Sequence, residues 1–225
     1  MGDFTGIVVD NNGMGTTTVV AADSTGTNGD GIIVNGASST GDLNVTSTGT
    51  AMGGNDGIDV VNNGMGTTTV VAADSTGTNG DGIDVFGASS TGDLSVTSTG
   101  SAMGGDDGIE VDNFGMGTTT VMAADSIGAG LDGIDVFGGT TSGNLSVTST
   151  GTAMGGSDGI EVVNLGMGTT TVMAVDSTGT DGDGIFVYGD ASTLALSVTS
   201  TGTAMGGDEG IYCLLYTSPS PRDRG

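Results

Sequence analysis

Apolar and polar positions alternate at period two along most of this chain, and the alternating segments return at a fixed interval. Ile83-Asp84-Val85 places two apolar side chains on one face, and Leu94-Ser95-Val96 repeats that order. Alternation at period two, with many Val, Ile and Thr residues, is typical of β-strands with one buried face. We therefore expect two short strands in each repeat, separated by turns rich in Gly, Asn, Asp and Ser, and a third, weaker strand around residues 101–103.

The first isoleucine of the strand recurs at steps that alternate between 25 and 26 residues. Its positions are Ile7, Ile32, Ile58, Ile83, Ile109, Ile134, Ile160, Ile185 and Ile211. Two kinds of repeat therefore alternate, and together they form a 51-residue super-repeat that is present four times. Val70 and Val96 lie at the same distance before the next isoleucine, which places the odd residue in a loop between the two strands.

These repeats predict an all-β fold, a single-stranded parallel β-helix (β-solenoid) with about 25–26 residues per coil and roughly eight coils. One coil cannot bury its own apolar face, whereas coils stacked about 4.8 Å apart place isoleucine on isoleucine and valine on valine. The many glycines argue against helix, and we expect them at corners that need positive φ or a close approach between coils. We expect the glycine-flanked methionines to fill gaps at the corners.

The composition changes near the C-terminus. Both arginines, both prolines and the single cysteine lie within residues 213–225, whereas residues 1–212 hold all but one of the 27 acidic residues. Residues 213–223 resemble one reading frame of a transposon-end sequencing adapter. We therefore expect residues 1–212 to form the solenoid, residues 213–225 to be a non-native tail, and the chain to be a fragment of a longer protein.

The formal net charge of −25 limits the partners that this chain can bind. An acidic surface repels nucleic-acid phosphates and anionic lipids, so we expect no nucleic-acid partner. No apolar run reaches the length of a membrane span, so we expect no membrane insertion by this segment. Residues 1–212 contain no Lys, Arg, His or Cys, which removes the usual nucleophile–base pairs and cationic clamps, and we expect no enzymatic activity.

The stacked coils would carry two files of acidic side chains, which are the candidate functional residues of this chain. The first file precedes each Gly-Ile pair and consists of Asp30, Asp56, Asp81, Asp107, Asp132, Asp158 and Asp183, with Glu209 in the last coil. The second file lies three residues further along and consists of Asp59, Asp84, Glu110, Asp135 and Glu161. One hypothesis is that the first file is a ladder of Ca²⁺ ligands, and no other cofactor is expected. The other is that these carboxylates cap turn amides, which the ordinary turn chemistry of Asp-Gly favours.

Threonine and aromatic positions recur as well. Residues 67–69 and 97–99 are threonine-rich triplets whose outward side chains would form a flat array for ice or carbohydrate, although threonine is also an ordinary strand former on a solvated face. Phe86, Phe137 and Tyr188 fall in alternate coils, where they would either form an aromatic stripe for glycan contact or cover a turn. Their spacing of about 10 Å is too large for direct ring stacking.

The order Gly-Ile-x-Val, a short polar turn, Leu-x-Val-Thr-x-Thr-Gly and then Asp-Gly-Ile covers nearly all of residues 3–212. It is clearest at residues 81–85 and 92–100, and it resembles the passenger repeats of bacterial autotransporter adhesins. The resemblance implies a right-handed parallel β-helix displayed on the outer surface of a Gram-negative cell, with host or matrix glycans or proteins as partners. We thus expect an extracellular, monomeric stalk or adhesive segment. The alternatives are a solenoid that binds Ca²⁺ or ice, and a carbohydrate-active β-helix that uses two carboxylates.

Overall fold

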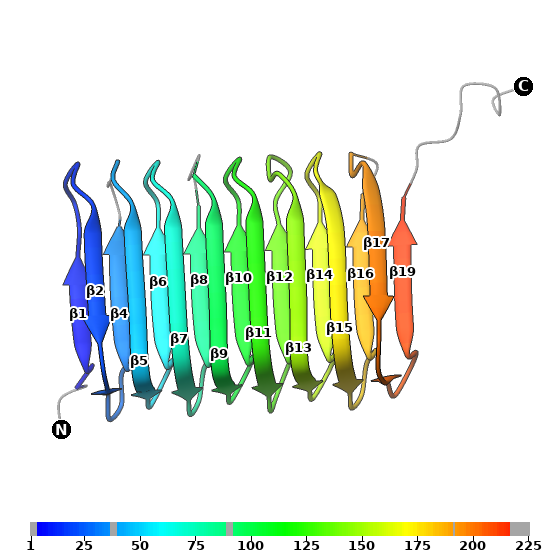
Figure 1. The fold of residues 1–225 in the computed structure, drawn as a ribbon, viewed down its shortest axis with the longest axis horizontal. Helices are drawn as coiled ribbons and strands as arrows, with labels where there is room; N and C mark the ends of the chain where they lie inside the picture. The colour runs from blue at the N-terminus through cyan, green and yellow to red at the C-terminus, as the bar shows by residue number, and fades with distance from the viewer. Residues whose placement is uncertain (1–3, 37–39, 89–91, 191, 217–225) are drawn as a thin grey trace, which may run out of the picture.

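The computed structural model describes residues 4–36, 40–88, 92–190 and 192–216, and these residues form strands and turns without any helix. The strands build two long parallel sheets, and the chain passes from one sheet to the other in every coil (Figure 1). The protein is therefore a β-solenoid of about eight coils, and the predicted all-β fold is confirmed. Within the described ranges there is no helical segment of the length and apolarity that a membrane span needs.

The first sheet contains one strand from each coil. Its strands are β1 (Ile7–Asp10), β4 (Ile32–Gly36), β6 (Ile58–Asn62), β8 (Ile83–Gly87), β10 (Ile109–Asn113), β12 (Ile134–Gly138), β14 (Ile160–Asn164), β16 (Ile185–Gly189) and β19 (Ile211–Leu215). β19 extends to Leu215 and pairs in register with β16, so residues 213–215 of the expected tail continue this sheet.

The second sheet contains the longer strands. Its main path consists of β2 (Thr17–Ala21), β5 (Leu43–Gly53), β7 (Thr68–Gly77), β9 (Leu94–Gly104), β11 (Thr119–Gly128), β13 (Leu145–Gly155), β15 (Thr169–Gly179) and β17 (Ala195–Ser200). Two short strands, β3 (Ser24–Thr25) and β18 (Ala204–Met205), pair with β5 and β15.

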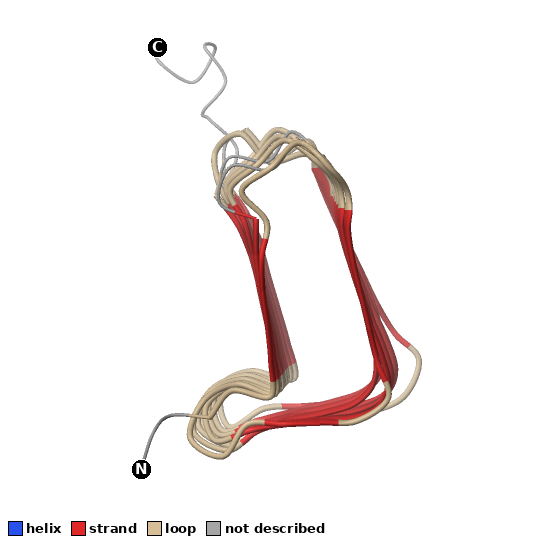
Figure 2. Cartoon of the chain, turned by 90° about the vertical axis from the view of Figure 1, so that its left-hand side faces the viewer, coloured by secondary structure: helices blue, strands red, loops and turns tan. Residues whose placement is uncertain are grey.

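Each coil has three straight sides in cross-section, because the long strands of the second sheet bend (Figure 2). In β9 the bend falls between Ser98 and Ala102, where the pairing with β7 shifts its register. We call the first sheet the first side, the part of the second sheet before the bend the second side, and the part after it the third side. The weak third strand expected near Ala102 is the continuation of β9 around this bend.

An aspartate of the preceding coil holds the bend of each longer coil in place. Thr99 Oγ1 donates to the carbonyl oxygen of Ala72 at 3.1 Å, and Asp74 Oδ1 accepts a hydrogen bond from the Ser101 amide at 2.9 Å. The second contact recurs in every super-repeat, with Asp23, Asp125 and Asp176 in the place of Asp74. The coil with the extra residue is therefore anchored to the shorter coil before it.

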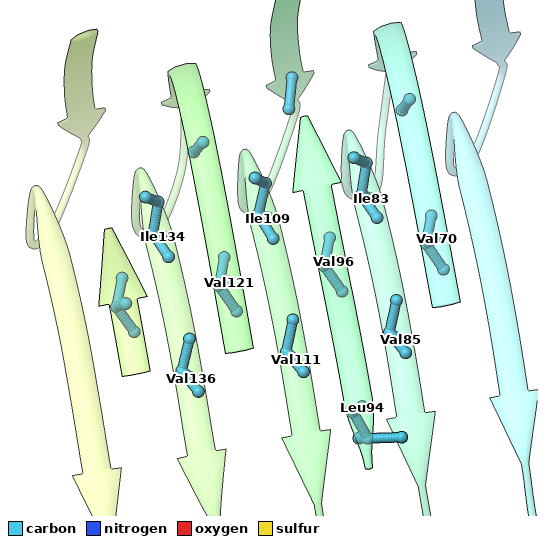
Figure 3. Packing of buried hydrophobic residues seen from close by; sticks show 14 of the residues in the cluster. Val70, Ile83, Val85, Leu94, Val96, Ile109, Val111, Val121, Ile134 and Val136 are labelled. Atoms are coloured by element: carbon cyan, nitrogen blue, oxygen red, sulfur yellow. The ribbon is translucent and has the colours of Figure 1, made fainter. Parts of the chain in front are cut away.

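The strands pair in the register that the isoleucine spacing predicts. Ile83 pairs with Ile58 and Ile109, and Val96 pairs with Val70. Figure 3 shows the isoleucine and valine files facing each other across a narrow core. Every isoleucine of the file from Ile32 to Ile185 is fully buried, and full burial of each such side chain contributes about 1.5–3 kcal/mol.

The two ends of the isoleucine file are less well covered. Ile7 in β1 is half-buried, and Ile211 in β19 is 45% exposed. β19 lies beyond β17, the last long strand of the second sheet, so no second-side strand covers Ile211 across the core. The stacking that buries the central isoleucines is thus a property of the array and not of the single coil.

Buried asparagines complete the turn between the first and second sides. Asn62 Nδ2 donates to the carbonyl oxygen of Gly66 at 3.0 Å and to Thr68 Oγ1 at 2.8 Å, while its Oδ1 accepts from the Gly64 amide at 2.8 Å. The sequence did not single out these residues. Asn113 and Asn164 occupy the same position in the next two super-repeats and are also fully buried.

The glycine expectation is confirmed in one of its two forms, and the methionine expectation is corrected. None of the described glycines has a positive φ, and at most of them an added Cβ would clash with a neighbouring coil, whereas Gly15 has no atom within 4 Å. The prediction that methionines fill corner gaps is wrong, because their side chains lie on the surface. Exposure is 41% or more at all eight glycine-flanked positions, which are Met14, Met52, Met65, Met103, Met116, Met154, Met167 and Met205.

Candidate functional site

The seven aspartates predicted as metal ligands form one continuous file where the third side meets the first. Each lies in the turn directly before a first-side strand, one glycine ahead of the buried isoleucine. Six of them are at most 9% exposed, namely Asp30, Asp56, Asp81, Asp107, Asp132 and Asp183. Asp158 is half-buried. Close stacking of like charges at about 4.8 Å costs about 1 kcal/mol per neighbouring pair even in bulk water.

Each aspartate of this first file accepts a hydrogen bond from the backbone amide of the next member. Asp56 Oδ1 accepts from the Asp81 amide at 2.7 Å, and Asp81 Oδ1 accepts from the Asp107 amide at 2.8 Å. The same contact links all the remaining consecutive pairs of the file, from Asp30 to Glu209. The predicted capping of turn amides is therefore present, and it occupies the Oδ1 atom of each carboxylate.

The second acidic file faces outward from the first side. Asp84 pairs in register with Asp59 and Glu110, and Asp135 pairs with Glu110 and Glu161. All five side chains are half-buried. The file is bounded by apolar side chains in the same register, Ile33 at one end and Phe186 at the other.

Among the described residues, the structure brings the two files together in three carboxylate trios, one in each of the first three super-repeats. The carboxylate oxygens within each trio lie within 4.8 Å of one another. The trios are Asp30, Asp56 and Asp59; Asp81, Asp107 and Glu110; and Asp132, Asp158 and Glu161. In the fourth super-repeat, Asp183 and Glu209 recur, but Tyr212 takes the third position. The sequence indicated both files, but not that alternate coils would group them in threes.

The first trio contains a carboxylate oxygen without a partner. Asp59 Oδ1 is buried and accepts no hydrogen bond, whereas Asn55 Nδ2 donates to Asp30 Oδ1 at 3.0 Å and to Asp56 Oδ2 at 2.7 Å. Ca²⁺ binds oxygen ligands at about 2.3–2.6 Å, so ligands on opposite sides of one ion lie about 5 Å apart. The spacing within a trio therefore fits three ligands of one divalent cation.

Burial and neighbouring negative charge raise the pKa of the second file. Burial, followed by the charges of nearby aspartates, raises the pKa of Asp59 to about 7 and that of Asp84 to about 8. The pKa of Asp135 rises to about 8, first through burial and then through the charge of Glu161. Burial also raises the pKa of Glu110, with the charge of Asp84 as the next cause. At neutral pH this file therefore keeps part of its protons.

Four aspartates of the first file also have raised pKa values. Burial raises the pKa of Asp56 to about 6 and that of Asp107 to about 7, against the effect of the amide hydrogen bonds that each accepts. The pKa of Asp81 and that of Asp158 are also raised, again first by burial. An amide donor favours the ionised form, so these hydrogen bonds limit the rise in pKa.

Only part of each predicted threonine array faces outward. Thr68 and Ser98 are buried and belong to the inner face of the second side. Thr69 pairs with Ser95, and Thr97 pairs with Val71, so the outward positions form two separate files of mixed composition. The alternation at period two therefore splits each triplet between core and surface.

The aromatic positions are joined by a residue that the sequence pattern missed. Phe114 lies 5.6 Å from the ring of Phe86 and 5.2 Å from that of Phe137, measured between ring centroids. Phe86 and Phe137 are in alternate coils, as predicted, and the ring of Phe114 enters from the coil between them. Phe114 lies in the turn after β10, so the alignment of strand positions in the sequence did not group it with Phe86 and Phe137.

Two recesses lie on the outside of the bend between the second and third sides. One has a volume of about 250 Å³ and is lined by Thr97, Ser98, Thr99, Met122, Ala123, Ala124 and Thr150. The other has a volume of about 140 Å³ and is lined by Thr148, Ser149, Thr150, Met173, Ala174, Val175 and Thr201. Neither lining includes a carboxylate, so neither recess offers the acid pair of a glycosidase.

No protein-family model, curated protein or solved structure matches this chain.

Proposed function

We propose that this chain is a structural segment, the stalk of an exported cell-surface repeat protein. The observation that supports this function is the uniformity of the array, because one register continues through the first sheet and the second sheet repeats the same shift at its bend. The candidate surfaces also recur at 51-residue intervals, as the three carboxylate trios do. A catalytic site needs one unique constellation, whereas a spacer needs equal units that add length.

The hydrogen-bond ladders between successive coils support a stiff rod. Three sides of each coil hydrogen-bond to the next coil, and the core files run the length of the stack. Eight coils at about 4.8 Å give a rod roughly 38 Å long, and each super-repeat adds about 10 Å. In a longer parent protein, the number of super-repeats would set the distance between the cell surface and whatever the stalk carries.

Deletion of residues 83–133, which removes one super-repeat and joins Gly82 to Ile134, is expected to shorten the rod and leave it folded. Small-angle X-ray scattering should show a length smaller by about 10 Å, with the cooperative thermal transition retained. A glycan array probed with both chains should show no saturable binding. Saturable binding that the deletion removes would contradict the spacer function and favour the adhesive one.

A second function, binding of divalent cations, is favoured by one specific observation. The partnerless Asp59 Oδ1 lies within a group of carboxylates whose spacing suits Ca²⁺. Since Asp30 and Asp56 belong to successive coils, a cation held by that trio would join the two coils. Such a cation would offset the burial and the repulsion that together raise the pKa of Asp59, and it would stiffen the rod.

Titration with CaCl₂ at pH about 8 is expected to raise the melting temperature by several degrees, since a ligand at 100 times its Kd stabilises by about 2.7 kcal/mol per site. Calorimetry should give three sites per chain, the number of trios. The variant Asp59→Asn/Glu110→Gln/Glu161→Gln should lose the response. The control Asp181→Asn/Asp208→Asn, which changes two exposed acids, should keep it. A calcium response shared equally by both variants would exclude the trios as the binding sites.

A further inference from the structure

The outer face of the second side carries no charged residue, although the chain has 27 acidic ones. Two outward files make up this face. One consists of Thr18, Asn44, Thr69, Ser95, Thr120, Ser146, Thr171 and Ser197, and the other consists of Val20, Thr46, Val71, Thr97, Met122, Thr148, Met173 and Thr199. A second chain of the same net charge can therefore approach the middle of this face without meeting carboxylates, which lie along its edges: Asp42 and Asp93 before the strands, and Asp74, Asp125 and Asp176 at the bend.

The second of these files alternates between threonine and a larger apolar side chain. Three of the four apolar members are exposed, with Val20 at 69%, Met122 at 46% and Met173 at 48%, whereas Val71 is half-buried. Along the file they recur every second coil, which corresponds to about 10 Å. The face thus presents a row of apolar projections at a fixed spacing.

Recesses border the same face at the same spacing. The recess over Ala123 and Ala124 lies between the bends at Thr99 and Thr150, and its counterpart over Ala174 lies in the next super-repeat. The longer coils, which hold the extra residue, therefore project on either side of a shorter coil at the bend. Projections and recesses share the 51-residue period, so a partner that seats one methionine in one recess seats the next methionine in the next recess.

We propose that this face pairs with the same face of a second copy of the chain, with Met122 and Met173 of each copy seated in the recesses of the other. A two-fold arrangement of this kind is isologous and closes as a dimer. The face measures about 38 Å by about 17 Å, or roughly 650 Å² per copy, so the pair buries about 1,300 Å². That area lies within the range of about 1,200–2,000 Å² found in stable interfaces.

The projecting methionines also favour a second copy of the chain over an ice surface as the partner of this face. A lattice such as ice requires an even array, and side chains that protrude in every second coil interrupt it. A second copy has matching recesses, whereas a flat lattice has none. The inference goes beyond the stalk function, because it concerns how two such segments associate laterally and replaces the expectation of a monomer.

Sedimentation velocity of the full chain tests the proposal, at about 0.15 M salt so that repulsion between the acidic copies is screened. The wild-type chain should sediment as a dimer, and Met122→Lys/Met173→Lys should weaken the dimer at least tenfold. The matched control Met116→Lys/Met167→Lys adds the same charges at two turn methionines that are 63% and 68% exposed, and it should remain dimeric. All four positions are exposed, so circular dichroism should show the same fold in every variant.

A wild-type chain that stays monomeric at about 0.1 mM, a concentration far above the Kd of a micromolar dimer, would overturn the proposal. Equal weakening by both double variants would also overturn it, because charge alone would then explain the effect. Thermal hysteresis by a monomeric wild-type chain would assign the face to ice instead. Saturable glycan binding that only Met122→Lys/Met173→Lys removes, in a monomeric chain, would assign it to a carbohydrate.

Discussion

Raising the pH from about 5 to about 9 is expected to lower the melting temperature by roughly 10 °C or more, in the absence of divalent cations. The cause is the second acidic file, where the pKa of Asp59 is about 7 and those of Asp84 and Asp135 are about 8. In the unfolded chain these groups titrate near pH 4. Thermal melts followed by circular dichroism across this pH range measure the effect.

The sign follows from linkage. A carboxyl whose pKa is higher in the folded state holds its proton there more tightly than in the unfolded state, so its full stabilisation is present below about pH 4. That stabilisation is lost as the pH rises through the folded pKa values of about 7–8. Each unit of pKa is worth less than about 1.4 kcal/mol here, because solvent reaches these half-buried groups. Summed over the file, several kcal/mol remain.

The variant Asp84→Asn/Asp135→Asn is the direct check, since an amide is neutral at every pH. It should melt at a higher temperature than the wild type at pH about 8 and should show a flatter pH profile. The control Asp181→Asn/Asp208→Asn removes the same number of charges at exposed positions and should retain the wild-type profile. If the wild-type melting temperature rose between pH 5 and pH 9, the stacked carboxyls could not be the dominant titrating groups.

The substitution Gly108→Ala is expected to destabilise the protein by at least about 3 kcal/mol, the upper part of the usual range for overpacking. An added Cβ at Gly108 would lie 2.5 Å from the carbonyl oxygen of Gly133 and 2.6 Å from the amide nitrogen of Ile127. Both atoms belong to the backbone of the next coil, which cannot move without disturbing the ladder. Denaturant unfolding monitored by circular dichroism should show the loss as a lower midpoint.

Gly15→Ala is the matched control, because an added Cβ there meets no atom within 4 Å and the backbone φ is not positive. It should leave stability unchanged or raise it by about 0.4–1 kcal/mol through the smaller entropy of the unfolded chain. A similar loss of stability for both substitutions would mean that glycine flexibility, and not the close approach of coils, explains the glycine content.

The register of the array was readable from the sequence because side chains alternate strictly along a strand and coils repeat at a fixed length. The spacing of the isoleucines predicted their pairing, and the residues aligned with Val96 and Asp84 are those that the structure pairs with them. The same reasoning could not place residues outside the strands. Phe114 and the exposed methionines Met14, Met65, Met116 and Met167 lie in turns, where no fixed period relates sequence position to direction.

The sequence by itself determined the coil length, the files that line the core and the two acidic files, because each depends only on a period of two within strands and a period of about 25–26 between coils. Only the tertiary structure decided which carboxylates meet in trios, that Asp59 Oδ1 has no partner, and that the uncharged face carries both projections and recesses. Those features depend on the bend of the long strands and on distances between turns of successive coils. Neighbours of this kind are set by packing in three dimensions, which a one-dimensional period does not specify.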